Sequence, residues 1–370
     1  MLAPMLLAAS ASGQLIYLSF GDSITFGTGD GTERGGYPPR LEDLLNQAGE
    51  NVEVQNHGEP GEFTNEGVTR IDDVLAMGGD VLLLMEGTND IARGLSEETT
   101  LFNLGEMARK AEGLGMEVVI ASLIPRIPGA RIDPENILNQ RLVEGIRDLA
   151  GSSMRDLVDP FEEWQTIENL FDRFYAELEE DPVGHPNAAG YDSMASTFFD
   201  VLTGTDSVPP VTGVTLPKTG RTEVPAGATI RMDVWDFGEG IDVAATELFI
   251  NGETVAADVG GNPSRVRIEW TLDAAQRGRI DIGLRSRDLA SPANVVDRVV
   301  ATFDVELDEL VGDIDDSGRV DGVDLVLFAR SFGADVGESR YLEEADFDSD
   351  GTIDGEDLAV LASGFGTSLS

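Results

Sequence analysis

Ser23 and His185 are the side chains best suited to nucleophilic chemistry, because the chain offers few alternatives. It contains no cysteine and two histidines, His57 and His185. A thiol nucleophile, a disulfide framework and a zinc site built on several imidazoles are therefore excluded. A serine hydroxyl needs an adjacent base to attack a carbonyl near neutral pH, and histidine commonly serves as that base. Any histidine-dependent chemistry must use one of these two residues, and we interpret His57 as a partly exposed loop residue.

Four candidate site residues lie in short loops, each next to an expected strand or helix. Ser23, in Gly21-Asp-Ser-Ile-Thr25, follows a short apolar run, and Gly61 and Asn89 come just after two more such runs. His185 lies just before the helical pattern that begins at Asn187. The carboxyl ends of parallel strands meet at one edge of a sheet, where open α/β folds place their ligands. We therefore expect these four residues to converge, although they are far apart in the sequence.

The elements that position these residues alternate between strand and helix patterns from residue 14 to about 203. Such alternation predicts right-handed crossovers and a parallel sheet covered on both faces, which makes a three-layer α/β/α domain. The expected strands are residues 15–20, 52–54, 80–85, 117–123 and 157–158. The expected helices are residues 37–48, 104–114, 136–149 and 187–202.

On these residues, 14–203 resemble the SGNH (GDSL) hydrolase family. Ser23, Gly61, Asn89 and His185 match its four defining residues in order, and Gly35-Gly-Tyr-Pro38 and Met85-Glu-Gly-Thr-Asn-Asp90 resemble their surroundings. The resemblance implies a flavodoxin-like fold and a serine esterase that needs no cofactor for catalysis. It assigns Ser23 as nucleophile and His185 as base. It assigns the oxyanion hole to the Ser23 N–H, the Gly61 N–H and the Asn89 side-chain amide.

The acid that should orient the histidine departs from the family pattern. Relatives usually place Asp three residues before the histidine, and here that position is Pro182. A carboxylate is needed to hold the imidazole tautomer and to stabilise the imidazolium. We expect Asp181, four residues before His185, to serve. Glu180, or a Ser–His dyad oriented by a backbone carbonyl, remains open.

The hydrophobic period changes after the first domain. Residues 204–212, which include Ser207-Val-Pro-Pro210, are expected to form a linker. Residues 213–306 contain several alternating segments, and Asn251-Gly252 between two of them predicts a hairpin. We expect an all-β, Ig-like sandwich over 213–306.

Residues 307–370 contain a repeat with the oxygen-ligand spacing of a calcium loop. Loop positions 1, 3, 5, 9 and 12 are occupied by Asp313, Asp315, Ser317, Asp321 and Asp324, and again by Asp346, Asp348, Asp350, Asp354 and Asp357. The carbonyls of Arg319 and Thr352 would supply position 7. We expect two structural Ca²⁺ sites.

The same segment resembles a type I dockerin, because Asp replaces Glu at position 12 and a helix pattern follows each loop without preceding it. That resemblance implies a small α-helical calcium module and a cohesin-like protein partner. Loop positions 10 and 11 are Gly322-Val323 and Gly355-Glu356, not the small hydroxyl pairs common in cellulosomal dockerins. The identity of the partner therefore stays open.

The charge balance excludes several partners. The chain has 25 basic and 69 acidic residues, a formal net charge of −44. A nucleic-acid backbone or an anionic membrane surface would repel it. The sequence contains no run of 18 or more apolar residues, so we expect no transmembrane helix. The acidity, with arginine far exceeding lysine, is equally consistent with salt adaptation and with a GC-rich genome.

The N-terminal residues 1–13 resemble part of a secretory signal. Ala9-Ser10-Ala11 matches a small-x-small cleavage pattern, but no basic residue precedes the apolar stretch. We interpret the segment as a signal-peptide remnant and expect a secreted, extracellular protein, a disordered tail being the alternative.

Three functional hypotheses remain. The leading one is a secreted serine esterase with a calcium-dependent docking tail, acting on an ester substrate such as acetylated polysaccharide. The second is a lipase, lysophospholipase or thioesterase of the same family. The third is a non-catalytic binding scaffold, against which the intact Ser23, Asn89 and His185 argue.

Overall fold

The computed structural model describes residues 13–126, 132–176, 184–273, 276–305, 311–315, 317–338, 340–348 and 350–368. The chain forms two compact units. The first comprises the chain up to Arg221 together with Ala228–Leu272 and Ile280–Phe303. The second comprises Thr222–Gly227, Asp273–Arg279 and the chain from Asp304 onward.

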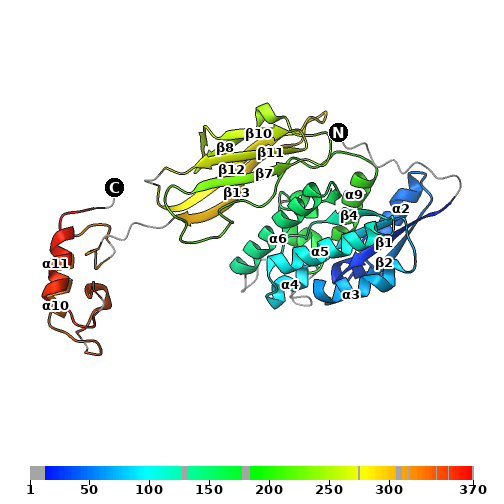
Figure 1. Cartoon of the computed structure of the whole chain (residues 1–370). Helices are drawn as coiled ribbons and strands as arrows, with labels where there is room; N and C mark the ends of the chain where they lie inside the picture. The colour runs from blue at the N-terminus through cyan, green and yellow to red at the C-terminus, as the bar shows by residue number, and fades with distance from the viewer. Residues whose placement is uncertain are drawn as a thin grey trace. The chain divides into compact units, whose positions relative to one another are not determined.

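A five-stranded parallel sheet forms the centre of the N-terminal domain (Figure 1). Its strand order is β2-β1-β3-β4-β5, and β3 is buried along its whole length, as its continuous apolar run requires. The predicted α/β/α class is confirmed. The strands are β1 (Leu15–Gly21), β2 (Val52–Gly58), β3 (Val81–Met85), β4 (Glu117–Ala121) and β5 (Asp156–Val158).

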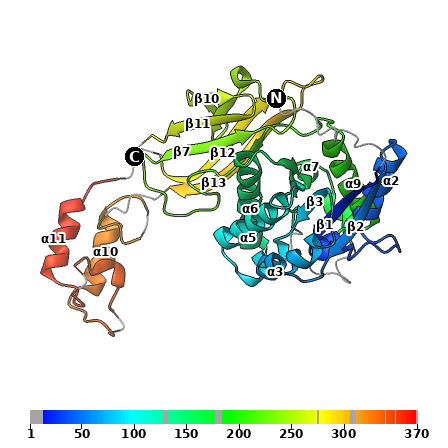
Figure 2. The same cartoon turned by 45° about the vertical axis from the view of Figure 1, so that its right-hand side comes forward.

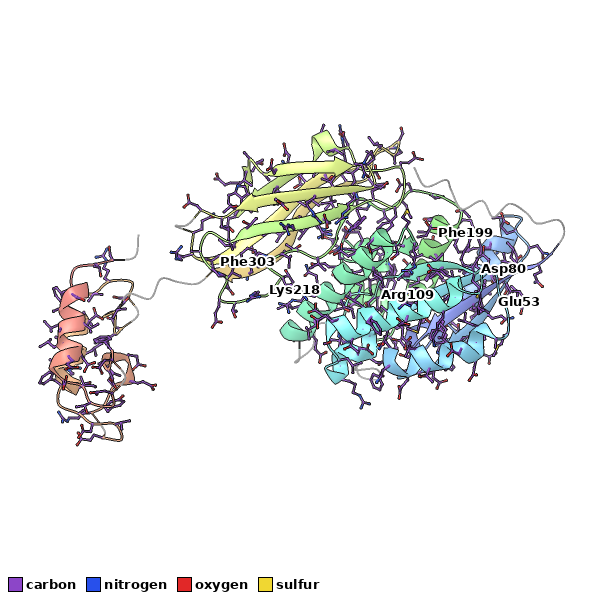
Figure 3. The ribbon with its side chains drawn as sticks, in the orientation of Figure 1. Glu53, Asp80, Arg109, Phe199, Lys218 and Phe303 are labelled. Atoms are coloured by element: carbon purple, nitrogen blue, oxygen red, sulfur yellow. The ribbon has the colours of Figure 1, made fainter. Side chains whose placement is uncertain are left out.

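The register of the sheet is fixed partly by a side chain. Asp80, labelled in Figure 3, lies just before β3. Its carboxylate accepts a hydrogen bond from the Ile16 backbone N–H at 2.8 Å, and its N–H donates to the Ile16 carbonyl. These two bonds align the start of β3 with β1, so that Gly21 pairs with Met85 at the other end. The loops that leave this end therefore begin at one level.

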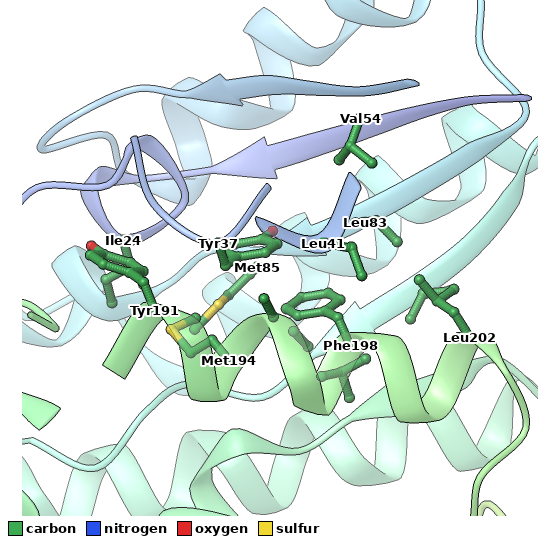
Figure 4. Close-up of a cluster of buried hydrophobic side chains, with 14 of the residues drawn as sticks. Ile24, Tyr37, Leu41, Val54, Leu83, Met85, Tyr191, Met194, Phe198 and Leu202 are labelled. Carbon is green, nitrogen blue, oxygen red and sulfur yellow. The ribbon is translucent and has the colours of Figure 1, made fainter. Parts of the chain in front are cut away.

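Helices cover both faces of the sheet, with α2 and α9 on one side and α3, α5 and α6 on the other (Figures 1 and 2). Figure 4 shows the first of the two resulting cores, where Tyr37 stacks on Phe198 at 4.4 Å between ring centroids. The helices are α1 (Ser23–Phe26), α2 (Pro38–Gln47), α3 (Thr64–Leu75), α4 (Thr88–Arg93), α5 (Glu97–Glu112), α6 (Ile132–Ser152), α7 (Pro160–Trp164), α8 (Leu170–Phe174) and α9 (Ala188–Leu202).

Two four-stranded antiparallel sheets follow, with orders β10-β11-β7-β6 and β13-β12-β8-β9. The all-β class predicted for this region is confirmed, and so is the hairpin, because Asn251 and Gly252 join β8 to β9 with φ of 50° and 86°. The Ig-like topology stays a prediction. The elements are β6 (Val211–Thr212), β7 (Thr229–Trp235), η1 (Val243–Ala245), β8 (Glu247–Ile250), β9 (Glu253–Val255), β10 (Asp258–Asn262), β11 (Arg265–Thr271), β12 (Gly278–Arg287) and β13 (Val295–Val305).

An arginine of α6 joins the hydrolase-like domain to the β region within the first unit. The Arg147 guanidinium, 3% exposed, contacts Asp159 at 2.7 Å and Glu162 at 3.0 Å and donates to the Thr212 carbonyl. Arg298 of β13 reaches the same Glu162 carboxylate at 2.6 Å. Buried cations paired in this way are costly to separate, so these contacts hold the two domains together.

The C-terminal module is built on its repeat. Helices α10 (Gly322–Ser331) and α11 (Gly355–Gly364) each begin where a predicted calcium loop ends, and η2 (Glu343–Ala345) lies between them. Its small core takes equivalent residues from both repeats, among them Ile314, Val320, Phe328, Ile353 and Leu361. The helical dockerin-like fold is confirmed. No helix among the described residues is long and apolar enough to cross a membrane.

Candidate active site

Ser23 lies at the first position of α1, directly after β1. Asp22 caps this helix, because its carboxylate accepts a hydrogen bond from the Ile24 N–H at 2.9 Å. Gly21 is required before it, since a Cβ there would lie 2.0 Å from the Met85 carbonyl oxygen. Because β1 packs closely against β3 at Gly21, the chain turns there directly into α1. This turn leaves Ser23 at the carboxyl edge of the sheet.

His185 meets Ser23 across 162 residues of sequence. Its Nε2 lies 2.8 Å from the Ser23 Oγ, and both residues are more than nine-tenths buried. The histidine loop is anchored by backbone bonds, from the Ala176 N–H to the His185 carbonyl and from the Asn187 N–H to the Phe174 carbonyl. The distance suits proton transfer from the hydroxyl to the imidazole.

Gly29 allows the loop after α1 to approach the histidine. Its φ is +86°, and a Cβ would lie 2.8 Å from both the His185 Cβ and the Pro186 carbonyl oxygen. Tyr191 of α9 donates to the Thr28 carbonyl at 2.7 Å, and this bond holds the same loop against α9. The base is therefore positioned by backbone packing from two directions.

Asp181, the expected third member, lies outside the described residues, as do Glu179 and Glu180. The assignment of Asp181 accordingly remains a prediction, with Glu180 and the dyad as its alternatives.

Asn89 and Gly61 are brought together through Glu62. Asn89 Nδ2 donates to the Glu62 carbonyl at 2.9 Å, which links α4 to the loop after β2. Gly61 lies next in that loop with a φ of +83°. An amide nitrogen carries two hydrogens, so this bond orients the Asn89 side chain and leaves a second donor. The Asn89 side chain is thus fixed to the loop that contains Gly61.

Asp90 braces the site from below. Its carboxylate accepts hydrogen bonds from the Thr64 N–H and hydroxyl at the start of α3 and from the Thr100 hydroxyl of α5. Asp90 is 1% exposed. Because these partners lie on two other helices, Asp90 holds α4 against α3 and α5.

Two further buried acids have raised pKa values. Burial, with smaller contributions from Asp90 and Glu62, raises the pKa of Asp22 to about 7. Burial also raises the pKa of Glu86 well above its usual range, and neither Glu86 carboxyl oxygen has a hydrogen-bond partner in the described structure. Glu86 was not predicted from the sequence, although it stands directly before the Gly87-Thr-Asn-Asp90 segment. A neutral Glu86 is the form that this site favours.

Other candidates fall outside the site. His57 lies on β2, not in the loop we predicted, and burial followed by the nearby Arg70 charge lowers its pKa. Trp164 is fully buried and packs on Phe174 and Tyr175 at 5.2 and 5.8 Å between ring centroids. Trp164 therefore belongs to the hydrophobic core.

The two predicted calcium loops bring carboxylates together. Oxygens of Asp313, Asp315 and Asp324 lie within 4.8 Å of one another in the first loop, and those of Asp346, Asp348 and Asp350 do so in the second. Such oxygen clusters fit Ca²⁺. Asp324 and Asp357, the last residue of each loop, accept equivalent bonds from three backbone N–H groups of their own loops. Asp321 and Asp354 cap α10 and α11, and the Ser317 hydroxyl lies 3.3 Å from the Arg319 carbonyl. The Thr352 hydroxyl contacts Asp335.

Comparisons with known proteins give two family matches. Residues 19–192 match the model of the GDSL-like Lipase/Acylhydrolase family, and residues 311–364 match the Dockerin type I domain. No curated protein matches the chain.

Several solved structures are similar to the first domain. The SGNH-hydrolase family esterase AlinE4 is 27% identical over 43% of this chain and 83% of its own, with a TM-score of 0.37. The lipase/acylhydrolase from Enterococcus faecalis is 22% identical over 52% of this chain and 96% of its own, with a TM-score of 0.44. A variant of Axe2, an acetyl xylan esterase from Geobacillus stearothermophilus, is 20% identical over 51% and 94%, with a TM-score of 0.43.

Proposed function

We propose that this protein, whose residues 19–192 belong to the GDSL-like lipase/acylhydrolase family, hydrolyses carboxylic esters through Ser23 and His185. The family makes it a carboxylic ester hydrolase, and the observation that supports this assignment of residues is the 2.8 Å approach of His185 Nε2 to Ser23 Oγ. Two groups so placed form a nucleophile and its general base.

The reaction follows acyl transfer in two steps. As Ser23 Oγ attacks the ester carbonyl carbon, His185 Nε2 takes the hydroxyl proton and then delivers it to the departing alkoxide. Water attacks the acyl-serine with His185 again as base, which releases the acid and restores Ser23. Asp181 holds the second imidazole nitrogen.

We infer that the Ser23 N–H, the Gly61 N–H and the second hydrogen of Asn89 Nδ2 receive the oxyanion of the tetrahedral intermediate. The bond from Asn89 to the Glu62 carbonyl supports this role, because it fixes the Asn89 amide before the reaction. One such donor contributes about 3–4 kcal/mol to transition-state stabilisation.

A polar groove beside Gly61 supports a short acyl group on a hydroxyl-rich alcohol. Most of its described lining is polar or charged: Glu59, Glu62, Asn65, Glu66, Thr69, Arg70 and Asp73, with Pro60 as the apolar side chain. A long acyl chain would gain little there, because burial of apolar surface requires apolar partners. Sugar hydroxyls can instead hydrogen-bond to these groups.

The tail supports the same substrate class. Dockerin domains bind calcium, and a dockerin implies a cohesin partner in an extracellular assembly. We infer that the tail binds two Ca²⁺ ions and attaches a secreted enzyme to such an assembly. Acetylated polysaccharide is the substrate that both the polar groove and a dockerin tail favour. The argument from the tail rests on analogy.

Paired assays separate this proposal from its alternatives. An acyl-chain-length series of p-nitrophenyl esters should show the highest kcat/KM for acetate, and the enzyme should release acetate from acetylated xylan. A maximum at long chains would favour a lipase or lysophospholipase, and a preference for acyl thioesters would favour a thioesterase. No turnover of any ester would favour a binding scaffold.

A further inference from the structure

Three aspartates from separate segments meet in the first unit, away from Ser23 and from the dockerin loops. Asp206 belongs to the linker, Asp236 directly follows β7, and Asp288 directly follows β12. One carboxylate oxygen from each lies within 4.8 Å of the others. Segments about 30 and 50 residues apart in sequence therefore place three acidic groups at one point.

Each carboxylate is held in place by neutral donors. Asp236 Oδ1 accepts from the Gly238 and Gly240 N–H groups at 3.0 and 2.7 Å. Asp288 Oδ1 accepts from the Asn294 N–H at 2.8 Å and from the Ala290 N–H, and Asp288 Oδ2 accepts from Asn294 Nδ2. These bonds orient the oxygens but leave their negative charges unbalanced. Among the described residues, no arginine or lysine forms an ion pair with any of the three.

An independent observation identifies the group that lacks a partner. Asp236 is 7% exposed, and its Oδ2 is buried without any hydrogen-bond partner in the described structure. A buried acceptor left unsatisfied costs about 1–3 kcal/mol, and more when it is charged. Burial, with a smaller contribution from the neighbouring Asp206, raises the pKa of Asp236 to about 7. A cation bound at this point would give Asp236 Oδ2 a partner and would favour the ionised form of the carboxylate.

Gly238 makes room for the linker carboxylate. A Cβ at Gly238 would lie 2.3 Å from the Asp206 Cγ and Oδ2. Asp206 Oδ2 also accepts from the Glu239 N–H at 2.7 Å, so the turn after β7 forms a backbone cradle for the linker side chain. A cleft lined by Asp206, Gly238 and Glu239, among others, opens beside the cluster and gives an ion and its waters a way in.

We propose that Asp206, Asp236 and Asp288 bind one calcium ion that fastens the linker to the β region. Calcium takes oxygen ligands at about 2.3–2.6 Å, so two oxygens on opposite sides of one ion are at most about 5 Å apart. The 4.8 Å limit of the cluster meets that condition. An all-oxygen, carboxylate-rich set of irregular geometry favours Ca²⁺ over the octahedral Mg²⁺ and over softer metals. Water from the cleft completes the coordination.

Terbium luminescence sensitised by tryptophan can report this site in the full-length protein. All three tryptophans lie in the first unit, and Trp235 is the sequence neighbour of Asp236, whereas the dockerin repeats contain none. Wild type should give a saturable signal that Ca²⁺ displaces and that Mg²⁺ displaces poorly. Asp236→Asn should weaken Tb³⁺ binding at least about tenfold, a difference of about 1.4 kcal/mol. Asp258→Asn, the same charge change on exposed β10, serves as the matched control and should bind as wild type does.

Thermal unfolding of the first unit separates ion binding from a structural role. In EGTA, Asp236→Asn should match or exceed the wild-type midpoint, because it removes one of three facing charges. In Ca²⁺ the wild type should rise above the variant. Since the tail is identical in both proteins, its own response cancels in this comparison.

Two results would overturn the proposal. One is unchanged tryptophan-sensitised Tb³⁺ binding in Asp236→Asn; the other is an equal loss of stability in Ca²⁺ and in EGTA. If Asp236→Asn does not fold, Asp206→Asn gives the same two readings from the linker side. Gly238→Ala should also weaken binding, because its Cβ displaces Asp206.

Discussion

The hydrolase site and the dockerin loops both depend on buried or crowded acids, yet they solve the charge problem differently. Around Ser23, Asp90 is satisfied by threonine and backbone donors, and Asp22 and Glu86 have pKa values raised by burial. In the loops, the carboxylates gather within 4.8 Å with mostly backbone donors around them. The first region can hold its geometry through packing and protons alone, whereas the second needs a cation.

The difference teaches that one chain can carry two kinds of functional site with opposite dependence on the medium. We expect a site that is held by hydrogen bonds between its own residues to be insensitive to calcium. A loop of facing carboxylates is stabilised only as far as calcium binds its folded form. Variants and conditions that alter one region and leave the other unchanged therefore test the account.

The largest effect is expected at the third member of the triad. Asp181→Asn should lower kcat by about 10⁴, because the histidine would lose the control of its tautomer. Glu180→Gln is the matched control and should change kcat little. Steady-state hydrolysis of p-nitrophenyl acetate measures both. A larger loss in Glu180→Gln than in Asp181→Asn would show that the loop register is wrong.

The oxyanion donor should come next. Asn89→Ala should reduce kcat about 10²–10³-fold with a smaller change in KM, because the lost hydrogen bond forms mainly in the transition state. Asn51→Ala, at an exposed position before β2, is the control. If Asn89→Ala lowers kcat/KM only by raising KM and leaves kcat unchanged, that result would contradict this role for Asn89.

Removal of calcium should act on the tail and not on the catalytic domain. When free Ca²⁺ exceeds the dissociation constant about 100-fold, binding stabilises the folded loops by about 2.7 kcal/mol. Hydrogen exchange of the full chain should therefore show faster exchange in α10 and α11 in EGTA than in Ca²⁺. The strands β1 to β5 should exchange alike in both. Unchanged protection of α10 and α11 would argue against calcium-coupled folding.

The smallest effect is a pH dependence of stability from Asp22. Its pKa is raised to about 7 in the folded protein from the usual 3.8 of an aspartate, so between these pH values the folded state holds a proton that the unfolded state releases. The stabilisation is present below about pH 4 and is lost as the pH rises through about 7.

Asp22→Asn keeps an oxygen acceptor for the Ile24 N–H and removes this titration. At pH 8 the variant should be more stable than wild type by about 1–2 kcal/mol. The full difference between the folded and unfolded pKa of Asp22 corresponds to roughly 4 kcal/mol, and relaxation of the structure around the ionised carboxylate reduces it. The difference should vanish near pH 4. Denaturant unfolding at the two pH values measures it, and a constant difference would contradict the assignment.

The sheet could be predicted from sequence because its strands are short apolar or alternating segments that are separated by helical patterns. Val81 to Met85 is buried throughout and was the clearest case. The helix α3 was missed, although Val68, Ile71 and Leu75 recur at helical spacing. Its first turn contains Gly67, whose missing Cβ accommodates the Glu86 carboxyl, and that residue weakened the pattern.

The meeting of Ser23 and His185 could be predicted, but the supports of the site could not. His185 Nε2 lies 2.8 Å from Ser23 Oγ, as expected, whereas the oxyanion roles of Gly61 and Asn89 stay predictions. The bond from Asn89 to the Glu62 carbonyl and the closeness of Gly29 to His185 depend on packing between segments, which no local pattern encodes. Asp206, Asp236 and Asp288 have no motif at all, because three unrelated turns bring them together.

The most direct test is to label the full-length protein with a fluorophosphonate probe in Ca²⁺ and in EGTA, at a temperature where the first unit stays folded. The account predicts covalent modification at Ser23 alone, at the same rate in both conditions, and none in Ser23→Ala. Modification that persists in Ser23→Ala, or that disappears in EGTA, would contradict a reactive serine preformed by His185 without calcium.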